Sequence, residues 1–137
     1  MKSGTPSLIV VDTHVLVFDA LDPARLSARA RRTLAQGSTN AEIACCDISL
    51  WEIAMLIAKG RLDPGMGARQ FLDDLIAAHR VSVLPVNPDI AVIAQSDAFA
   101  HGDPADRLIG ATAMFNRSRL ITSDAMLRKV KGLATVW

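Results

Sequence analysis

Acidic side chains follow short apolar segments at several places along this 137-residue chain. Asp12 ends LIVVD, Asp124 ends LITSD, and Glu52 lies in SLWEIAMLIAKG, which follows another apolar run. Asp103 and Asp106 open the stretch DPADRLIGATA. Carboxylates gathered in one place repel one another unless a cation lies between them, and oxygen ligands favour Mg²⁺ or Mn²⁺. Because a bound divalent ion activates water and stabilises charge on phosphate oxygens, such a site suits phosphoryl chemistry.

The same acids also have a simpler interpretation as helix caps. Asp103 is expected to be an N-cap, with Pro104 as the first helical residue and Asp106 answering the helix dipole in the first turn. Ser49 and Glu52 have the spacing of a capping box. The acids that directly end apolar strands are harder to explain in this way, because a neutral turn residue would serve there. Taken singly, the motifs leave both interpretations open.

The order of apolar runs and helical segments predicts the elements that position these acids. Strands are expected at 8–12, 43–46, 81–86, 118–124 and 133–137. Helices are expected at 27–37, 49–60, 66–80, 88–100 and 104–117. Short apolar strands that alternate with helices are typical of a three-layer α/β/α sandwich with a central parallel sheet, here of four to five strands. Ligands bind beyond the carboxyl ends of such strands, so the scattered acids can share one pocket.

Two helices carry more specific expectations. Ser27 can cap the helix 27–37, and Gly37 is expected to end it. The helix 49–60 is apolar on nearly all sides, which predicts deep burial with Trp51 in the core or in a dimer contact.

Composition limits the class of protein. The chain is 50% hydrophobic and 21% charged with a formal net charge of +1, which favours one globular domain and gives no strong electrostatic signature. We interpret residues 1–7, MKSGTPS, as a disordered lead-in or expression remnant, and residues 8–137 as a single domain. The adjacent Cys45 and Cys46 would point to opposite faces of a strand, which argues against a disulfide and favours a reducing, cytoplasmic location.

Absent motifs exclude further classes. No apolar run approaches the roughly 18 residues of a transmembrane helix, so we expect no membrane association. The chain has neither a G-x-G-x-x-G motif nor a P-loop, so we expect no nucleotide cofactor.

Four segments in order, VVDTHVL, ISLWEIAMLIAKGRL, HGDPADRLIGATA and LITSD, closely resemble the PIN-domain family. More narrowly, they resemble the PIN-domain toxins of VapBC toxin–antitoxin pairs, and the resemblance extends from Leu8 to the C-terminus. It implies a metal-dependent ribonuclease in which water attacks an RNA phosphodiester in line and leaves 5′-phosphate and 3′-hydroxyl ends. The acids that match the family's catalytic and metal-binding positions are Asp12, Glu52, Asp106 and Asp124, with Asp103 as an auxiliary metal ligand.

The resemblance also implies supporting residues and partners. Thr13 and Thr122 occupy positions where related proteins use a hydroxyl to orient the acids. The implied partners are an RNA substrate, a small VapB-like antitoxin whose C-terminal segment blocks the acidic pocket, and a second copy of the chain in a homodimer.

Several arginines are candidates for contact with RNA phosphates. Arg25, Arg29 and Arg32 recur at helical spacing, although a solvated helix face is the commoner meaning of that pattern. Arg107 can reach a phosphate or balance the neighbouring acids. Two alternatives to the ribonuclease stay open: a metal-dependent phosphatase or DNA nuclease on the same site, and a non-catalytic binding module in which the acids only cap helices.

Overall fold

A five-stranded parallel sheet forms the centre of the protein in a computed structural model that describes residues 7–100 and 102–137. The strands are Ile9–Val11 (β1), Ile43–Cys46 (β2), Ser82–Leu84 (β3), Arg119–Ile121 (β4) and Thr135–Val136 (β5). Their order across the sheet is β3-β2-β1-β4-β5, and every neighbouring pair is parallel. The predicted α/β/α sandwich is confirmed. Apart from Ser7, the predicted lead-in 1–7 lies outside the described residues.

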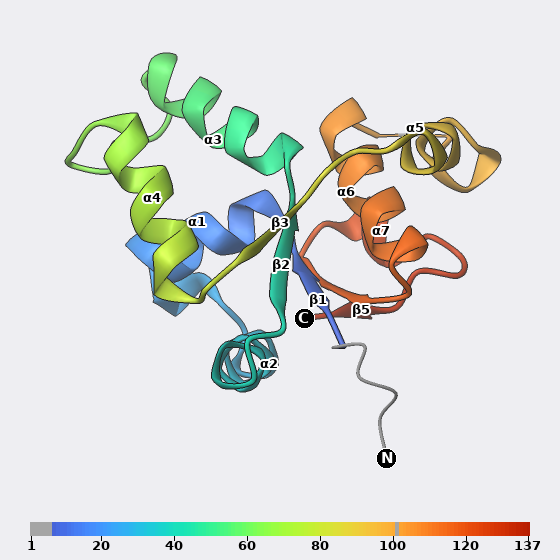
Figure 1. Cartoon of the computed structure of the whole chain (residues 1–137), viewed down its shortest axis with the longest axis horizontal. Coiled ribbons are helices and arrows are strands. Elements are labelled where there is room, and N and C mark those ends of the chain that lie inside the picture. Colours follow the sequence, from blue (N-terminus) through green and yellow to red (C-terminus); the bar gives the residue numbers. More distant parts are fainter. Residues whose placement is uncertain (1–6, 101) are drawn as a thin grey trace.

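Helices cover both faces of the sheet (Figure 1). They are Thr13–Leu21 (α1), Ala28–Thr39 (α2), Ile48–Ala58 (α3), Ala68–Ala78 (α4), Pro88–Ala94 (α5), Pro104–Phe115 (α6) and Ala125–Arg128 (α7), with 3₁₀ turns at Pro23–Arg25 (η1) and Asp97–Phe99 (η2). Helices α1 and α2 pack on one face, and α5, α6 and α7 pack on the other. Helices α3 and α4 extend the first layer by packing against α1. None of the described helices is long and apolar enough to cross a membrane.

The central strand β1 shows why β1 and β2 are apolar and buried at every position. Successive strand residues point to opposite faces, and here both faces are covered. Val11 packs among the residues of α1 and α2, whereas Val10 packs among those of α5, α6 and α7, and both are fully buried. The strand was predicted to end at Asp12, and it ends at Val11, but no helix was predicted for α1, because VVDTHVLVF continues the apolar, valine-rich character past Asp12.

Helix α2 begins as predicted and ends later than predicted. The Ser27 hydroxyl accepts a hydrogen bond from the Ala30 N–H at 3.0 Å, which confirms it as the N-cap. Gly37 does not end the helix, which continues to Thr39. A Cβ atom at Gly37 would lie 2.5 Å from Cδ1 of Ile43, so this glycine lets the helix approach the sheet closely.

Helix α3 is less buried than its composition predicted. Its inner face contributes Ile53 to the core shared with α1 and α4, but Trp51 is 61% exposed on the opposite side. The prediction of deep burial on all sides was wrong for this helix. It covers the end of the α1 layer and not the middle of the sheet, so one face has no neighbour among the described residues.

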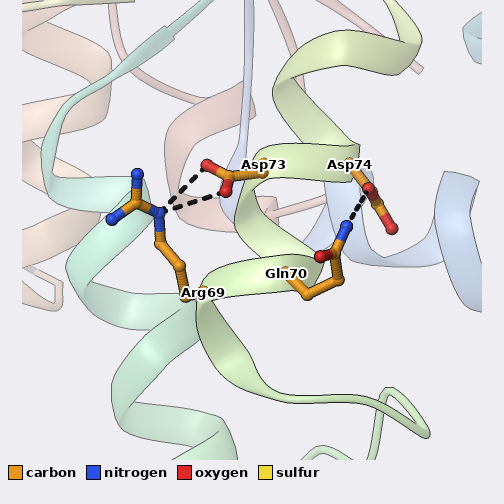
Figure 2. Close-up of polar contacts among 4 residues, drawn as sticks. All are labelled: Arg69, Gln70, Asp73 and Asp74. Carbon is orange, nitrogen blue, oxygen red and sulfur yellow. Dashed lines mark hydrogen bonds and ion pairs between the residues drawn. The ribbon is translucent and has the colours of Figure 1, made fainter.

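Helix α4 carries two polar side-chain contacts between its own residues. On its outer face, Arg69 Nε donates to Asp73 Oδ2 at 3.1 Å and Gln70 Nε2 donates to Asp74 Oδ1 at 2.8 Å (Figure 2). Such exposed i, i+4 pairs contribute about 0.2–0.5 kcal/mol each. These two aspartates therefore have local partners in solvent, unlike the acids that end the strands.

The C-cap residue of α4, His79, joins three helices. Its Nε2 lies 2.6 Å from Asp19 Oδ2 on α1, and its Nδ1 lies 2.9 Å from Ser38 Oγ on α2. Both ring nitrogens are thus used in holding the α1, α2 and α4 layer together.

Candidate metal centre

The carboxyl ends of β1 and β4 form the point where the strand order reverses. From β1 the chain adds β2 and β3 on one side, and it then crosses to add β4 and β5 on the other. A crevice at such a switch point is the usual ligand site of an open parallel sheet. The Asp12 N–H donates to the Ile121 carbonyl at 3.0 Å, which fixes the residue after β1 against the end of β4. Asp124 follows β4 at the same edge.

Asp12 is the most buried acid at this edge, with 4% of its surface exposed. Thr122 Oγ1 donates to Asp12 Oδ2 at 2.7 Å and accepts a hydrogen bond from the Asp124 N–H at 3.0 Å. The other carboxylate oxygen, Oδ1, is buried and has no hydrogen-bond partner within 7–100 and 102–137. Buried polar atoms are almost always satisfied, so this oxygen is available to a ligand such as a cation.

Glu52 is held by side chains and takes no part in a capping box. Helix α3 begins after the N-cap residue Asp47, so Ser49 lies inside the helix and the capping-box interpretation is wrong. Thr13 Oγ1 donates to Glu52 Oε1 at 2.5 Å and is hydrogen-bonded to Ser49 Oγ at 2.8 Å. Ser49 and Glu52 are three residues apart on one buried face, and that face meets the start of α1.

Helix caps place two more of the acids. Asp103 accepts a hydrogen bond from the Ala105 N–H at 2.8 Å, so its predicted role as the N-cap of α6 is confirmed. Asp124 caps α7 through Oδ1, which accepts from the Leu127 N–H at 3.0 Å. Capping fixes both carboxylates at the carboxyl edge of the sheet. In each residue the cap hydrogen bond uses Oδ1 and not Oδ2. The two interpretations that the sequence left open are therefore compatible.

Asp106 lies in the first turn of α6, where the negative charges of the other four acids all affect its pKa. Burial raises its pKa to about 7, and the raise is reinforced by the negative charges of Asp12, Asp124, Asp103 and Glu52, in that order. Burial also raises the pKa of Asp12 and of Glu52, and their threonine hydrogen bonds partly offset this. The five predicted acids thus form one electrostatic cluster.

The cluster suits a hard divalent cation in its donor chemistry. All of its members are oxygen donors, and the unpartnered Asp12 Oδ1 lies within it. Within residues 7–100 and 102–137, no three Asp, Glu, His or Cys side chains are already gathered closely enough to hold an ion.

The predicted arginines lie in different places. Arg107 lines a cavity of about 220 Å³ together with Asp103, Asp106 and Asp124, and its buried Nε has no hydrogen-bond partner in the described part of the chain. The guanidinium of Arg25 lies 4.1 Å from the centre of the Phe18 ring, in a second cavity that His14 and Arg61 also line. Arg29 and Arg32 are exposed on α2.

Sequence reasoning missed two residues near the centre. Ser49 was assigned to a cap, although its place three residues before Glu52 on an apolar helix could have indicated a shared inner face. The sequence alone suggested a structural or surface role for His14; it is exposed, and its charge lowers the pKa of both Asp12 and Glu52.

A parallel sheet with acids at its switch point, Thr122 holding Asp12 and Thr13 holding Glu52, defines a PIN-like nuclease fold. The family model of the PIN domain matches residues 9–133, so the chain belongs to the PIN-domain family. Among individual proteins, it is 33% identical to ribonuclease VapC22 of Mycobacterium tuberculosis (strain ATCC 25618 / H37Rv) over 133 residues, which cover 94% of this chain and 98% of that relative.

Solved structures show the same fold at lower identity. VapBC2 from Rickettsia felis, bound to a DNA fragment from its promoter, matches with a TM-score of 0.73 and 15% identity over 93% of this chain and 96% of that one. DNA-bound VapBC from Salmonella typhimurium matches with a TM-score of 0.73 and 16% identity over 94% of this chain and 96% of that one.

Proposed function

We propose that this chain is a metal-dependent endoribonuclease, the toxin of a toxin–antitoxin pair. The observation that carries the proposal is the buried Asp12, with one oxygen oriented by Thr122 and the other free, inside a cluster of five acids. The relative at 33% identity is a VapC ribonuclease, which supports RNA as the substrate class.

The cation is Mg²⁺ or Mn²⁺, held by carboxylates of the acidic cluster: Asp12, Glu52, Asp106 and Asp124, with Asp103 as an auxiliary ligand. When bound, the cation supplies an activated water and neutralises charge on the phosphate oxygens.

The chain's own residues prepare this site. The hydroxyls of Thr13 and Thr122 fix the orientation of Glu52 and Asp12 before any ligand arrives. Because the pKa of Glu52 is raised by burial, this carboxylate is suited to accept the proton of the attacking water. Arg107 lines the same cavity as Asp103, Asp106 and Asp124, which supports contact between its guanidinium and the phosphate. Arg25, Arg29 and Arg32 remain proposed contacts for more distant phosphates.

The partners follow from the family. We propose a VapB-like antitoxin, since the matched structures contain VapBC pairs, and we propose that its C-terminal segment blocks the acidic pocket. We also propose that residues 8–137 are one domain and that the free cysteines reflect a cytoplasmic location.

A homodimer is expected to use the exposed face of α3. Trp51 is 61% exposed there, and burying so large an aromatic side chain favours association. Sedimentation equilibrium should show a dimer for the wild type and a weaker dimer for Trp51→Ala. An unchanged dimer constant would place the interface elsewhere, and a monomeric wild type would contradict the dimer.

Cleavage of a cellular RNA pool tests the function. Purified protein should cut RNA with Mg²⁺ or Mn²⁺ and not with EDTA, and it should leave DNA and phosphomonoesters intact. Cleavage of DNA or of phosphomonoesters at a comparable rate would favour the alternative nuclease or phosphatase. The absence of all metal-dependent activity would favour a binding module.

Loss of the Thr122 hydroxyl should uncouple Asp12 from Asp124. In Thr122→Val, the Asp12 carboxylate loses its donor and the Asp124 N–H loses its acceptor, so we expect the free energy of unfolding to fall by about 1–3 kcal/mol. Misplaced ligands should lower cleavage about 10²-fold. Urea unfolding and RNA cleavage measure the two effects.

Two further variants separate position from stability. Thr122→Ser keeps the hydroxyl and should restore most of the activity. Thr112→Val removes an equally buried hydroxyl that contacts the Leu108 carbonyl and Cys46 and none of the five acids, and it should leave cleavage close to the wild-type rate. Equal losses of activity in Thr122→Val and Thr112→Val would contradict the positioning role.

A further inference from the structure

The cavity lined by Asp103, Asp106 and Asp124 has a neighbouring cavity along α7, distinct from the one beside Arg25. The cavity that contains the acids is lined in part by Met126 and Val130, and the same two residues line a neighbouring cavity of about 300 Å³. Lys129 and Lys131 also line this second cavity. The two hollows are therefore adjacent, and the path between them runs over Met126.

Helix α7 connects the two cavities directly. Its N-cap, Asp124, belongs to the acidic cluster, and its C-cap is Lys129. The helix has four residues, a length of about 6 Å at 1.5 Å per residue. A phosphate at the lysines would thus lie on the order of one or two nucleotides from a phosphate at the acids.

The charges of the two cavities are complementary parts of a site for a polyanion. An acidic centre repels the phosphates that flank a scissile bond, so these phosphates need cations nearby. Both lysines are exposed, and among the described residues neither ammonium group forms a side-chain hydrogen bond or an ion pair. Asp97 is the acid that lines the second cavity, and the two lysines outweigh it. Met126 is 48% exposed between the cavities and offers an apolar surface to a base or ribose.

We propose that Lys129 and Lys131 bind phosphates of the RNA strand next to the scissile one, so that the strand leaves the metal centre along α7 over Met126. The proposal rests on the proposed ribonuclease function and adds the direction of the strand to it. These lysines act on binding of the strand and have no part in the chemical step.

Salt-dependent RNA binding tests this strand path. A short fluorescein-labelled single-stranded RNA is titrated with protein carrying Asp12→Asn, which prevents cleavage, and anisotropy is recorded at several KCl concentrations. Adding Lys129→Gln and Lys131→Gln should weaken binding about tenfold and reduce the slope of log K against log salt by about 1.4, because each phosphate contact on a single strand contributes about 0.7. In cleavage-competent protein, the same pair should raise KM for RNA and leave kcat near the wild-type value.

The controls use the opposite edge of the sheet. Arg117 and Arg119 lie at the start of β4, and both line a cavity away from the acids, so Arg117→Gln with Arg119→Gln makes the same change of charge there. This pair should leave the salt slope unchanged, and Lys129→Arg with Lys131→Arg should retain it. Thermal unfolding with and without Mn²⁺ should show that both glutamine pairs fold and bind metal alike.

The outcomes distinguish the two proposals. If wild-type protein cleaves RNA but the lysine pair keeps the wild-type slope and KM, the strand does not follow α7. If both glutamine pairs reduce the slope equally, the effect belongs to net charge and the proposed path is wrong. If wild-type protein neither binds nor cleaves RNA, the ribonuclease function itself fails.

Discussion

Replacing Asp12 with asparagine is expected to lower metal-dependent RNA cleavage about 10²–10³-fold. A metal ion contributes several kcal/mol to transition-state stabilisation, and each 1.36 kcal/mol corresponds to a tenfold change in rate. Asparagine keeps the size of aspartate, and its side-chain oxygen can still accept the hydrogen bond of Thr122, so the fold should persist. It removes the charge on the one carboxylate, among the residues that the structure describes, whose second oxygen is buried and unpartnered.

The matched control is Asp73→Asn. Asp73 is an exposed acid whose partner, Arg69, lies on the same helix, so its replacement should leave the cleavage rate unchanged (Figure 2). Both variants and the wild type are purified in parallel and assayed with Mg²⁺, Mn²⁺ or EDTA. Equal cleavage by wild type and Asp12→Asn would mean that the activity comes from a contaminant or that the cluster is structural.

A second large effect should appear in thermal stability, where the stabilisation by Mn²⁺ depends on pH. At a concentration 100-fold above its Kd, a ligand stabilises the folded state by about 2.7 kcal/mol, which for a chain of this length raises Tm by about 8 °C. The pKa of Asp106 is raised to about 7, so below that pH a proton competes with the cation for this carboxylate. At pH 5.5 the competition weakens binding about 30-fold and leaves about 0.9 kcal/mol of the stabilisation.

Without metal, the pH dependence has the opposite direction. The folded protein holds a proton on Asp106 up to about pH 7, whereas the unfolded chain releases it near the ordinary value of 3.8. Between these values the folded state binds more protons, so this group's contribution to stability falls as pH rises and levels off above pH 7. Metal-free protein should therefore be less stable at pH 8 than an Asp106→Asn variant, which carries no charge at this position.

One set of melting curves of Asp106→Asn tests both the pH-dependent stabilisation by Mn²⁺ and the pH dependence of the metal-free protein. The variant should match or exceed the metal-free wild type at pH 8, and it should lose most of the Mn²⁺ shift. Asp73→Asn should keep the wild-type behaviour at each pH. A Mn²⁺ shift that is the same at pH 5.5 and pH 8, or one that survives in Asp106→Asn, would remove Asp106 from the metal centre.

The local sequence was sufficient where one interaction with the neighbouring backbone decides the structure. Ser27 and Asp103 are N-caps as predicted, because a short polar side chain satisfies the free N–H groups of its own helix wherever that helix lies. The apolar strands and their parallel arrangement followed from burial on both faces. The acids at the strand ends were predicted to meet, because all parallel strands present their carboxyl ends at one edge.

Local patterns failed where packing against a distant element decides the outcome. Gly37 has the signature of a helix end, but contact with Ile43 makes it an interior residue. Glu52 has the spacing of a capping box, but the start of α1 provides Thr13 as its partner. Trp51 belongs to an apolar helix, but that helix lies at the end of its layer, so the side chain is exposed and not in the core, and the dimer contact stays a prediction.

By itself, then, the sequence determined the α/β class, the acids and their common edge, because these depend on periodicity and residue type. Only the tertiary structure decided which Asp12 oxygen is free, how strongly Asp106 is coupled to the other acids, and that Lys129 lies beside their cavity. Those properties depend on distances between side chains from separate elements. Burial and electrostatic interactions depend on these three-dimensional distances, which the spacing of residues along the sequence does not give.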